Sequence, residues 1–97
     1  MRGRDLYIIQ QAKTGNIKVG RSSDVHRRLQ NLQTGSPYRL RIILHIPDQG
    51  IREREIHQRM RGRGTRWDGE WFEEGALSEL PDEYYERLDL EQQDWWR

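Results

Sequence analysis

Residues 6–20 read LYIIQQAKTGNIKVG, and this stretch decides how the fold begins. Residues 6–9 and residues 16–20 are two short runs that are typical of β-strands. Residues 14–16, Thr-Gly-Asn, lie between them and have the side chains that favour turns. The stretch therefore predicts a β-hairpin.

A helix is expected directly after the hairpin. Residues 22–24, Ser-Ser-Asp, offer side chains that can cap a helix. Val25, Leu29 and Leu32 then recur at the spacing of one helical face. The helix should end at Gly35.

The alternating pattern of residues 38–46 predicts a third strand. One face would carry Leu40, Ile42, Leu44 and Ile46. The other face would carry Arg39, Arg41, Ile43 and His45.

A second helix is expected over residues 51–61, with Ile56 and Met60 on its apolar stripe. The Gly-Arg-Gly sequence of residues 62–64 should end it. Residues 70–73 then have the pattern of a short extended segment.

We divide the chain into a domain over residues 1–77 and an acidic, aromatic extension over residues 78–97. A helix in the extension should begin at Pro81. Its apolar face would carry Tyr84, Leu88 and Trp95. The extension either covers the basic surface of the domain or docks elsewhere through this apolar face, and docking would bury side chains that are otherwise an aggregation liability.

The charge of the chain is divided sharply, although the net charge is only +1. Residues 1–66 carry 15 Lys and Arg against 5 Asp and Glu, which gives +10. Residues 67–97 carry 2 against 11, which gives −9. The basic part suggests an anionic partner, above all nucleic acid, and the acidic part is a second possible partner within the chain.

The composition excludes several classes of protein. The chain has no cysteine, so it has neither a disulfide framework nor a thiolate metal site. No apolar run approaches the roughly 20 residues that span a bilayer, and no apolar signal core follows the N-terminus. We expect one small cytoplasmic domain with no membrane partner.

Two arginines on the first helix should point in different directions. At about 100° per residue, Arg28 lies at the edge of the apolar stripe and Arg27 lies nearly opposite it. A guanidinium at the rim of a core can present its planar fork to a phosphate. The other interpretation of Arg28 is a surface cation whose stem packs over apolar neighbours.

The second helix shows the same contrast between its glutamates. Glu53 and His57 are i, i+4 neighbours beside the core face, whereas Glu55 points the other way. A carboxylate there could bind Mg²⁺, and His57 could hydrogen-bond the carboxylate or a phosphate. The alternative is a surface Glu–His pair that contributes about 0.2–0.5 kcal/mol.

Tyr7 and Lys18 lie on the two strands of the predicted hairpin. If they share a face, the lysine ammonium would favour the phenolate form of the tyrosine. Tyr7 would then be a candidate general base. With the other register they would be a half-buried strand tyrosine and a solvated lysine.

Six features follow one another in order between residues 5 and 74. They are residues 6–7, residues 18–20, Arg28, residues 32–37, Glu53 with His57, and residues 69–72. Together they resemble the motifs of the GIY-YIG nuclease superfamily, in its compact phage-associated branch. The ordered set is far more specific than any one of its members.

The resemblance implies an α+β fold, with a small three-stranded antiparallel sheet flanked by helices; the C-terminal helix would follow it. It also implies a divalent-metal-dependent DNA endonuclease that hydrolyses phosphodiester bonds with one Mg²⁺ or Mn²⁺ ion at Glu53. Tyr7 would be the base, Lys18 its modulator, Arg28 the phosphate clamp and His57 a supporting residue. The residues expected to contact DNA are Arg21, Arg28, Arg39 and Arg41.

The chain departs from the superfamily pattern at several positions. Asp5 stands where the first signature usually has glycine, and Lys18 stands where the second has tyrosine. Leu32 occupies a position where many members have Tyr or His, and the late asparagine of some members has no counterpart. An alternative is therefore a weak or inactive nucleic-acid-binding module with the same fold.

Under either interpretation the partner is DNA, in a bacterial or phage-infected cell. Most such domains are fused to a specificity module, for which this chain has no room. We therefore expect low intrinsic sequence specificity or a separate targeting protein.

Overall fold

The hairpin of β1 (Asp5–Gln11) and β2 (Ile17–Ser22) forms the middle of the sheet. The two strands pair antiparallel, with Tyr7 opposite Gly20 and Ile9 opposite Lys18. The predicted hairpin is thus confirmed, and its register places Tyr7 and Lys18 on one face of the sheet.

Three further strands complete the sheet in the computed structural model. The structure describes residues 3–62, 67–68 and 71–89. The added strands are β3 (Leu40–Ile46), β5 (Trp71–Phe72) and β4 (Trp67–Asp68). The strand order is β3-β1-β2-β5-β4 and every pairing is antiparallel. The predicted α+β class is confirmed, but the sheet has five strands instead of three, because a strand of two residues is too short to show an alternating pattern.

A β-bulge in β3 corrects the prediction for its two faces. The pairing with β1 shifts register between Ile8, opposite Leu44, and Ile9, opposite Ile42. One additional residue reverses which face each later side chain occupies. Leu40 and Ile42 therefore pack on one side of the sheet, while Leu44 and Ile46 pack in the core on the other side.

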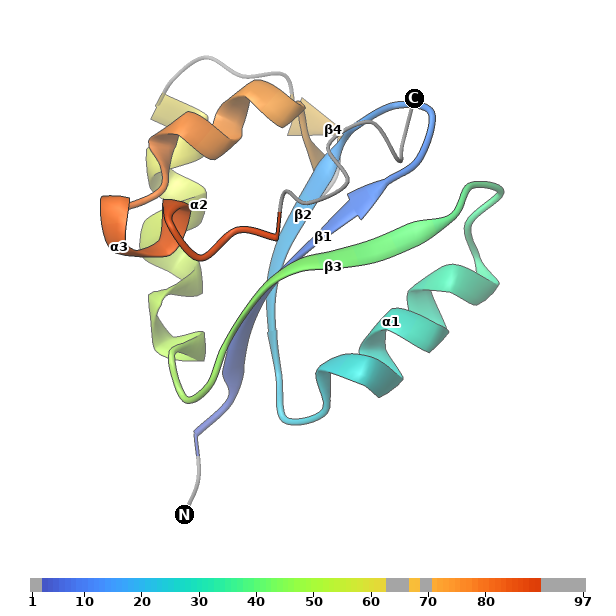
Figure 1. The fold of residues 1–97 in the computed structure, drawn as a ribbon, viewed down its shortest axis with the longest axis horizontal. Helices are drawn as coiled ribbons and strands as arrows, with labels where there is room; N and C mark the ends of the chain where they lie inside the picture. Colours follow the sequence, from blue (N-terminus) through green and yellow to red (C-terminus); the bar gives the residue numbers. More distant parts are fainter. Residues whose placement is uncertain (1–2, 63–66, 69–70, 90–97) are drawn as a thin grey trace.

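Helix α1 (Val25–Thr34) covers the first of these two faces (Figure 1). The Asp24 carboxylate accepts a hydrogen bond from the Arg27 backbone N–H at 3.1 Å and so caps the helix. The helix ends at Gly35 as predicted. The predicted stripe is also confirmed, since it packs with Tyr7 and Ile9 in a small core; its members are Val25, Leu29 and Leu32.

Helix α2 (Glu53–Gly62) lies on the opposite face and is led in by the single turn η1 (Gly50–Arg52). Ile56 and Met60 are fully buried there, as their spacing predicted. The residues 63–64 that should end this helix lie outside the described residues.

Gly50 ties the start of η1 to the beginning of β1. Its backbone N–H donates to the Arg4 carbonyl at 2.7 Å. A Cβ at this position would lie 2.7 Å from the same oxygen and 3.0 Å from the Arg21 Cβ. The close approach therefore requires glycine, and it places the first turn of α2 beside β2.

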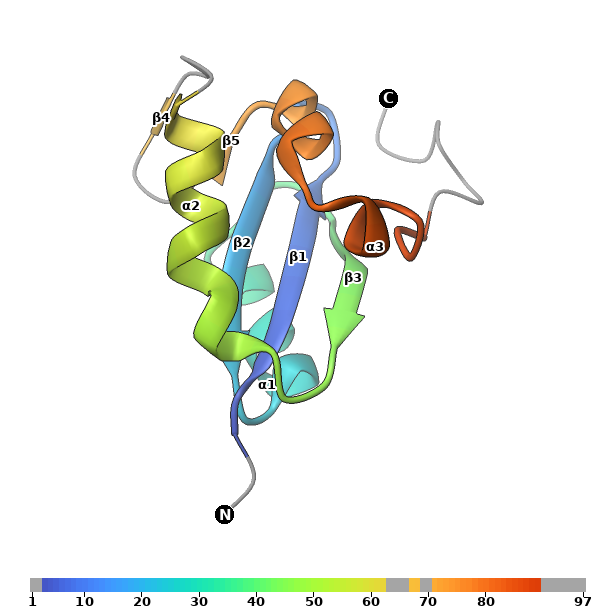
Figure 2. The ribbon, with the colours of Figure 1, turned by 90° about the vertical axis from the view of Figure 1, so that its left-hand side faces the viewer.

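The short helices η2 (Glu74–Glu79) and α3 (Asp82–Tyr85) cover the same face as α2 (Figure 2). They share one large core with α2 and the sheet, to which this part of the chain contributes Ala76, Leu77, Leu80, Tyr84 and Leu88. The prediction of a long C-terminal helix was wrong, because α3 ends at Tyr85. The chain then turns so that Leu88 reaches the core and the Asp89 N–H donates to the Ile43 carbonyl at 2.8 Å. Trp95 lies outside the described residues.

Arg52 connects α3 to the start of α2. Its guanidinium donates to the Glu55 carboxylate at 2.6 Å, to the Glu83 carboxylate at 2.9 Å and to the Tyr84 hydroxyl at 3.1 Å. These bonds, with Glu55 contributing most, raise the pKa of Arg52 further above its ordinary value. The Tyr84 hydroxyl in turn donates to the Gln49 side-chain oxygen at 3.0 Å.

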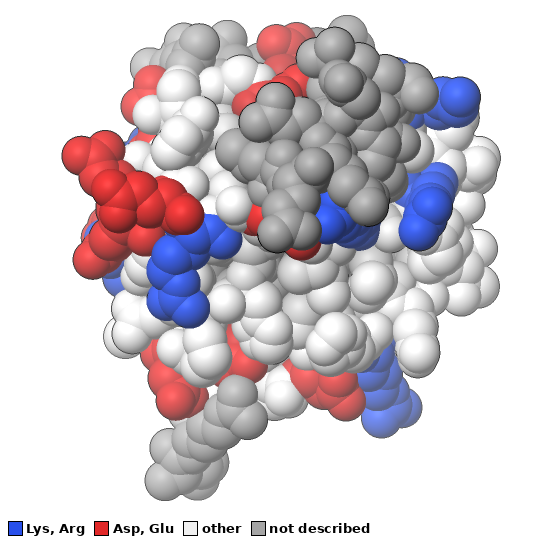
Figure 3. Space-filling model, in the orientation of Figure 1, with Lys and Arg blue, Asp and Glu red and all other residues white. Residues whose placement is uncertain are grey.

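Acidic side chains gather on the side of the molecule where α3 lies (Figure 3). Asp82, Glu83 and Glu86 are exposed on this helix and its last turn. Since Glu83 and Glu55 share Arg52, this acidic group lies on the Glu55 side of α2.

Tyr84→Phe should lower the free energy of unfolding by about 1–3 kcal/mol, because Arg52 and Gln49 each lose a partner that is partly buried. Tyr85→Phe is the matched control, since Tyr85 is 47% exposed and its change should lie within about 0.5 kcal/mol. Chemical denaturation of both variants measures the difference. Equal effects would show that the Arg52 connection does not stabilise the fold.

Candidate active site

The outer edge of β2 is open over most of its length. β5 pairs only with Ile17 and Lys18, so within the described part of the chain no strand continues the sheet beside residues 19–22. Helix α1 approaches this edge from one face of the sheet and α2 from the other. Side chains from both faces can therefore meet at the edge.

A hollow of about 210 Å³ lies at this open edge. It is lined by Arg4, Tyr7, Lys18, Val19, Gly20, Arg21, Arg28, Glu53 and His57. All five residues that we predicted to be catalytic are among them, although they come from β1, β2, α1 and α2. Arg27, on the far side of α1, does not line the hollow.

Tyr7 is held by its position across from Gly20. The tyrosine is only 2% exposed, and a Cβ built on Gly20 would overlap its phenol oxygen and ring. Glycine is therefore required here because the phenol passes over the backbone of β2. Lys18, on the same face, is 7% exposed and its Nζ lies 5.9 Å from the centroid of the Trp71 ring.

His57 joins α2 to the open edge of β2. Its Nε2 lies 2.7 Å from the Val19 carbonyl oxygen, and because a carbonyl can only accept, Nε2 carries the proton. The ring also packs edge-on against Phe72, with centroids 5.6 Å apart. The imidazole is therefore fixed in both position and tautomer.

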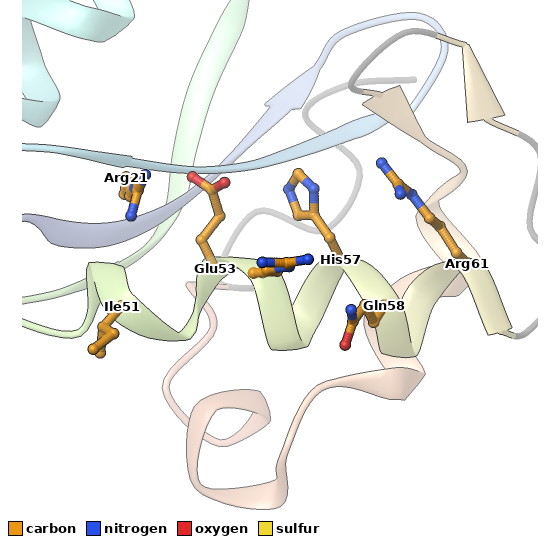
Figure 4. A pocket seen from close by; sticks show the side chains of 7 residues that line it. Arg21, Ile51, Glu53, His57, Gln58 and Arg61 are labelled. Atoms are coloured by element: carbon orange, nitrogen blue, oxygen red, sulfur yellow. The ribbon is translucent and has the colours of Figure 1, made fainter.

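Glu53 lies one helical turn before His57 and is partly buried. The carboxylate points toward β2, in the same direction as the His57 ring (Figure 4). Among the described side chains of residues 3–61 and 71–89, none forms an ion pair with Glu53, whereas exposed Glu55 is bound to Arg52. The two glutamates thus differ as their helical positions predicted.

The donors at the hollow suit a hard divalent cation better than zinc. The described residues contain no group of three His, Cys, Asp or Glu side chains that could hold a metal ion. Mg²⁺ and Mn²⁺ are commonly bound by one or two carboxylates, with water and phosphate oxygens completing the shell. Glu53 in a hollow with room for water and a phosphate fits this requirement.

The predicted DNA-contacting arginines are divided by the fold. Arg21 and Arg28 line the hollow, but Arg39 and Arg41 do not. The β3 strand is two strands away from β2, and Arg41 donates to the Asp89 carboxylate at 2.6 Å. Arg4 lines the hollow and was not predicted, because no periodic pattern precedes β1 to indicate its direction.

Asp5, where the resemblance would have placed glycine, has a structural function. It is 3% exposed, and its carboxylate contacts His45 Nε2 at 2.8 Å and accepts from the Asp48 N–H at 3.0 Å. It thereby ties the start of β1 to the end of β3.

Comparison with protein families assigns most of the chain to one known domain family. Residues 6–90 match the model of the T5orf172 domain. The chain belongs to the T5orf172 domain family. This family is phage-associated and of nuclease type. Searches of curated proteins and of solved structures found no match for this T5orf172 domain. None of its described helices is long and apolar enough to cross a membrane.

Gly20→Ala should destabilise the T5orf172 domain by about 1–3 kcal/mol, because the added methyl overlaps Tyr7 in a packed region. Gly35→Ala is the control, since its Cβ would meet nothing closer than the Leu32 carbonyl at 3.9 Å. In a Tyr7→Ala background the cost of Gly20→Ala should largely vanish. Additive effects in this double-mutant cycle, measured by denaturation, would contradict the assigned contact.

Proposed function

We propose that this T5orf172 domain is a GIY-YIG-type DNA endonuclease that depends on one Mg²⁺ or Mn²⁺ ion. The observation that carries the proposal is the hollow of about 210 Å³ at the open edge of β2. There a tyrosine, a lysine, three arginines, a carboxylate and an oriented histidine converge from α1, α2, the β1–β2 hairpin and the residue before it. DNA is the expected substrate because the first 66 residues carry a strong excess of positive charge.

Glu53 would hold the metal ion, which when bound supplies Lewis-acid polarisation of the phosphate. Arg28 would bind the non-bridging phosphate oxygens through its planar fork and counter the charge that develops on them. His57 contributes by holding α2 against β2, which keeps Glu53 facing the hollow.

Tyr7 is the candidate base for the attacking water. Tyr7 lines the hollow and is almost fully buried where it passes over Gly20, so its position is set by packing. As the water oxygen bonds to phosphorus, its proton passes to Tyr7 in the phenolate form, and the bond from phosphorus to the leaving sugar oxygen breaks. The leaving oxygen takes a proton from solvent. Lys18 lies on the same face and is the cation that would modulate this base.

One observation favours a non-catalytic DNA-binding module as the second candidate. Leu32 packs against the small core with Val25 and does not line the hollow. The position where many superfamily members carry Tyr or His therefore adds no polar group to this site. Plasmid nicking assayed with and without Mg²⁺ separates the two functions.

Glu53→Gln should reduce metal-dependent cleavage by at least about 10²-fold, since the ion loses its protein carboxylate. DNA affinity should stay within several-fold, because phosphate contacts supply most of it. Glu55→Gln, which alters the exposed glutamate bound to Arg52, should cleave like the parent. Undiminished cleavage by a folded Glu53→Gln protein would sink the assignment.

Arg28→Ala should reduce the cleavage rate by about 10²–10³-fold, as expected for removal of a donor that stabilises the transition state. Arg27→Ala removes an equally exposed arginine that does not line the hollow, and it should change the rate only slightly. Single-turnover rates of the two variants compare them directly. Similar losses would refute a specific function for Arg28.

A further inference from the structure

A second hollow of about 510 Å³ continues from the candidate active site along α2. Its lining residues are Arg21, Ile51, Glu53, Arg54, His57, Gln58 and Arg61. Arg21, Glu53 and His57 line both hollows, so the two are continuous at the open edge of β2. We call the second hollow the α2 groove.

The α2 groove occupies one flank of the helix. At about 100° per residue, the lining positions from Glu53 to Gln58 fall within an arc of about 140°, next to the buried stripe of Ile56 and Met60. Glu53, His57 and Arg61 follow each other at i, i+4 and i+8, and all three side chains point toward β2 (Figure 4). Arg59 falls on the other flank, with Glu55.

The charge of the α2 groove suits a polyanion. The groove is lined by three exposed arginines, Arg21, Arg54 and Arg61. The only acid among its lining residues is Glu53. Guanidinium groups bind phosphate oxygens through two parallel hydrogen bonds. A groove that joins them to the candidate active site can hold phosphates beside the one that reacts.

The length of the groove sets the size of its ligand. Eight residues of α-helix separate Glu53 from Arg61, a rise of about 12 Å. Neighbouring phosphates of one DNA strand lie closer together than this distance, so the groove is long enough to span more than one phosphate.

Ile51 gives the groove an apolar end. It is 86% exposed, the most exposed of the large hydrophobic side chains in the described residues. It lies just before Glu53 on η1, whose start is fixed by the bond from Gly50 to Arg4. Isoleucine side chains in DNA-binding proteins can contact sugars or base faces, which are the apolar surfaces of a nucleic-acid strand.

We propose that the α2 groove binds the backbone of the DNA strand on one side of the scissile phosphate, over more than one nucleotide. Arg54 and Arg61 bind phosphates at different positions along this strand, and Ile51 contacts a sugar or base face. This inference rests on the proposed function, since the groove begins at Glu53. The inference adds a path for the DNA strand beyond the reacting phosphate. Arg54 and Arg61 would have no phosphate to bind if the substrate were an isolated phosphate ester.

The test measures binding without cleavage. Affinity for a short fluorescent DNA duplex is determined in a metal chelator at about 50 and about 200 mM salt, for the parent, Arg54→Ala, Arg61→Ala and Arg59→Ala. Each groove variant should weaken binding and lower the slope of log K against log salt by about 0.9, so that its loss shrinks about threefold at the higher salt. Arg59→Ala, on the other flank of the same helix, should leave the slope nearly unchanged.

Ile51→Ser completes the set, because an uncharged groove residue should weaken binding several-fold without changing the salt slope. Groove variants that bind like the Arg59→Ala control would overturn the proposal. Because no metal is present, loss of binding in these variants supports the groove even if the parent protein fails to nick plasmid DNA. Conversely, a parent that cleaves while Arg54→Ala and Arg61→Ala bind normally retains the proposed function and refutes the groove.

Discussion

The hydrogen bond from His57 Nε2 to the Val19 carbonyl is the contact on which the candidate site depends. Pairing with β5 stops after Lys18, so the backbone beyond it needs partners other than a strand. By donating to the Val19 carbonyl, the imidazole gives this backbone acceptor a hydrogen-bond partner. The same bond sets the distance between α2 and the sheet. Glu53, one turn earlier on the same side of the helix, is placed beside β2 as a result.

The opposite wall of the hollow is set by packing. Gly20 leaves the space that the Tyr7 phenol occupies, and the small core beneath α1 keeps the ring there. Arg28 reaches the same hollow because the apolar stripe of α1 holds the helix with this residue at its edge. The two walls thus belong to separate cores on the two faces of the sheet, and only the open edge of β2 brings them together.

The C-terminal part of the described chain supports this arrangement from the other flank of α2. Arg52 binds Glu55, Glu83 and Tyr84, and it immediately precedes Glu53 in the sequence. Glu83 and Tyr84 of α3 are therefore engaged on the flank of α2 that carries Glu55. The basic residues at the hollow remain on the other flank, where the α2 groove extends the site.

Much of this could be predicted from the sequence, because local periodicity determines which side of an element faces the core. The apolar stripes of α1 and α2 were sufficient to separate Arg28 from Arg27 and Glu53 from Glu55. These stripes could not place Arg39 and Arg41, because the strand order separates both residues from the hollow. They could not predict the reversal of faces at the bulge in β3 either, because the bulge depends on the pairing of β3 with β1. The acceptor of the His57 bond lies 38 residues away in the chain, and no spacing rule relates the two.

The sequence by itself therefore determined the elements and the direction of their side chains. Only the tertiary structure decided which side chains meet, because strand pairing and the open sheet edge join residues that are distant in the chain.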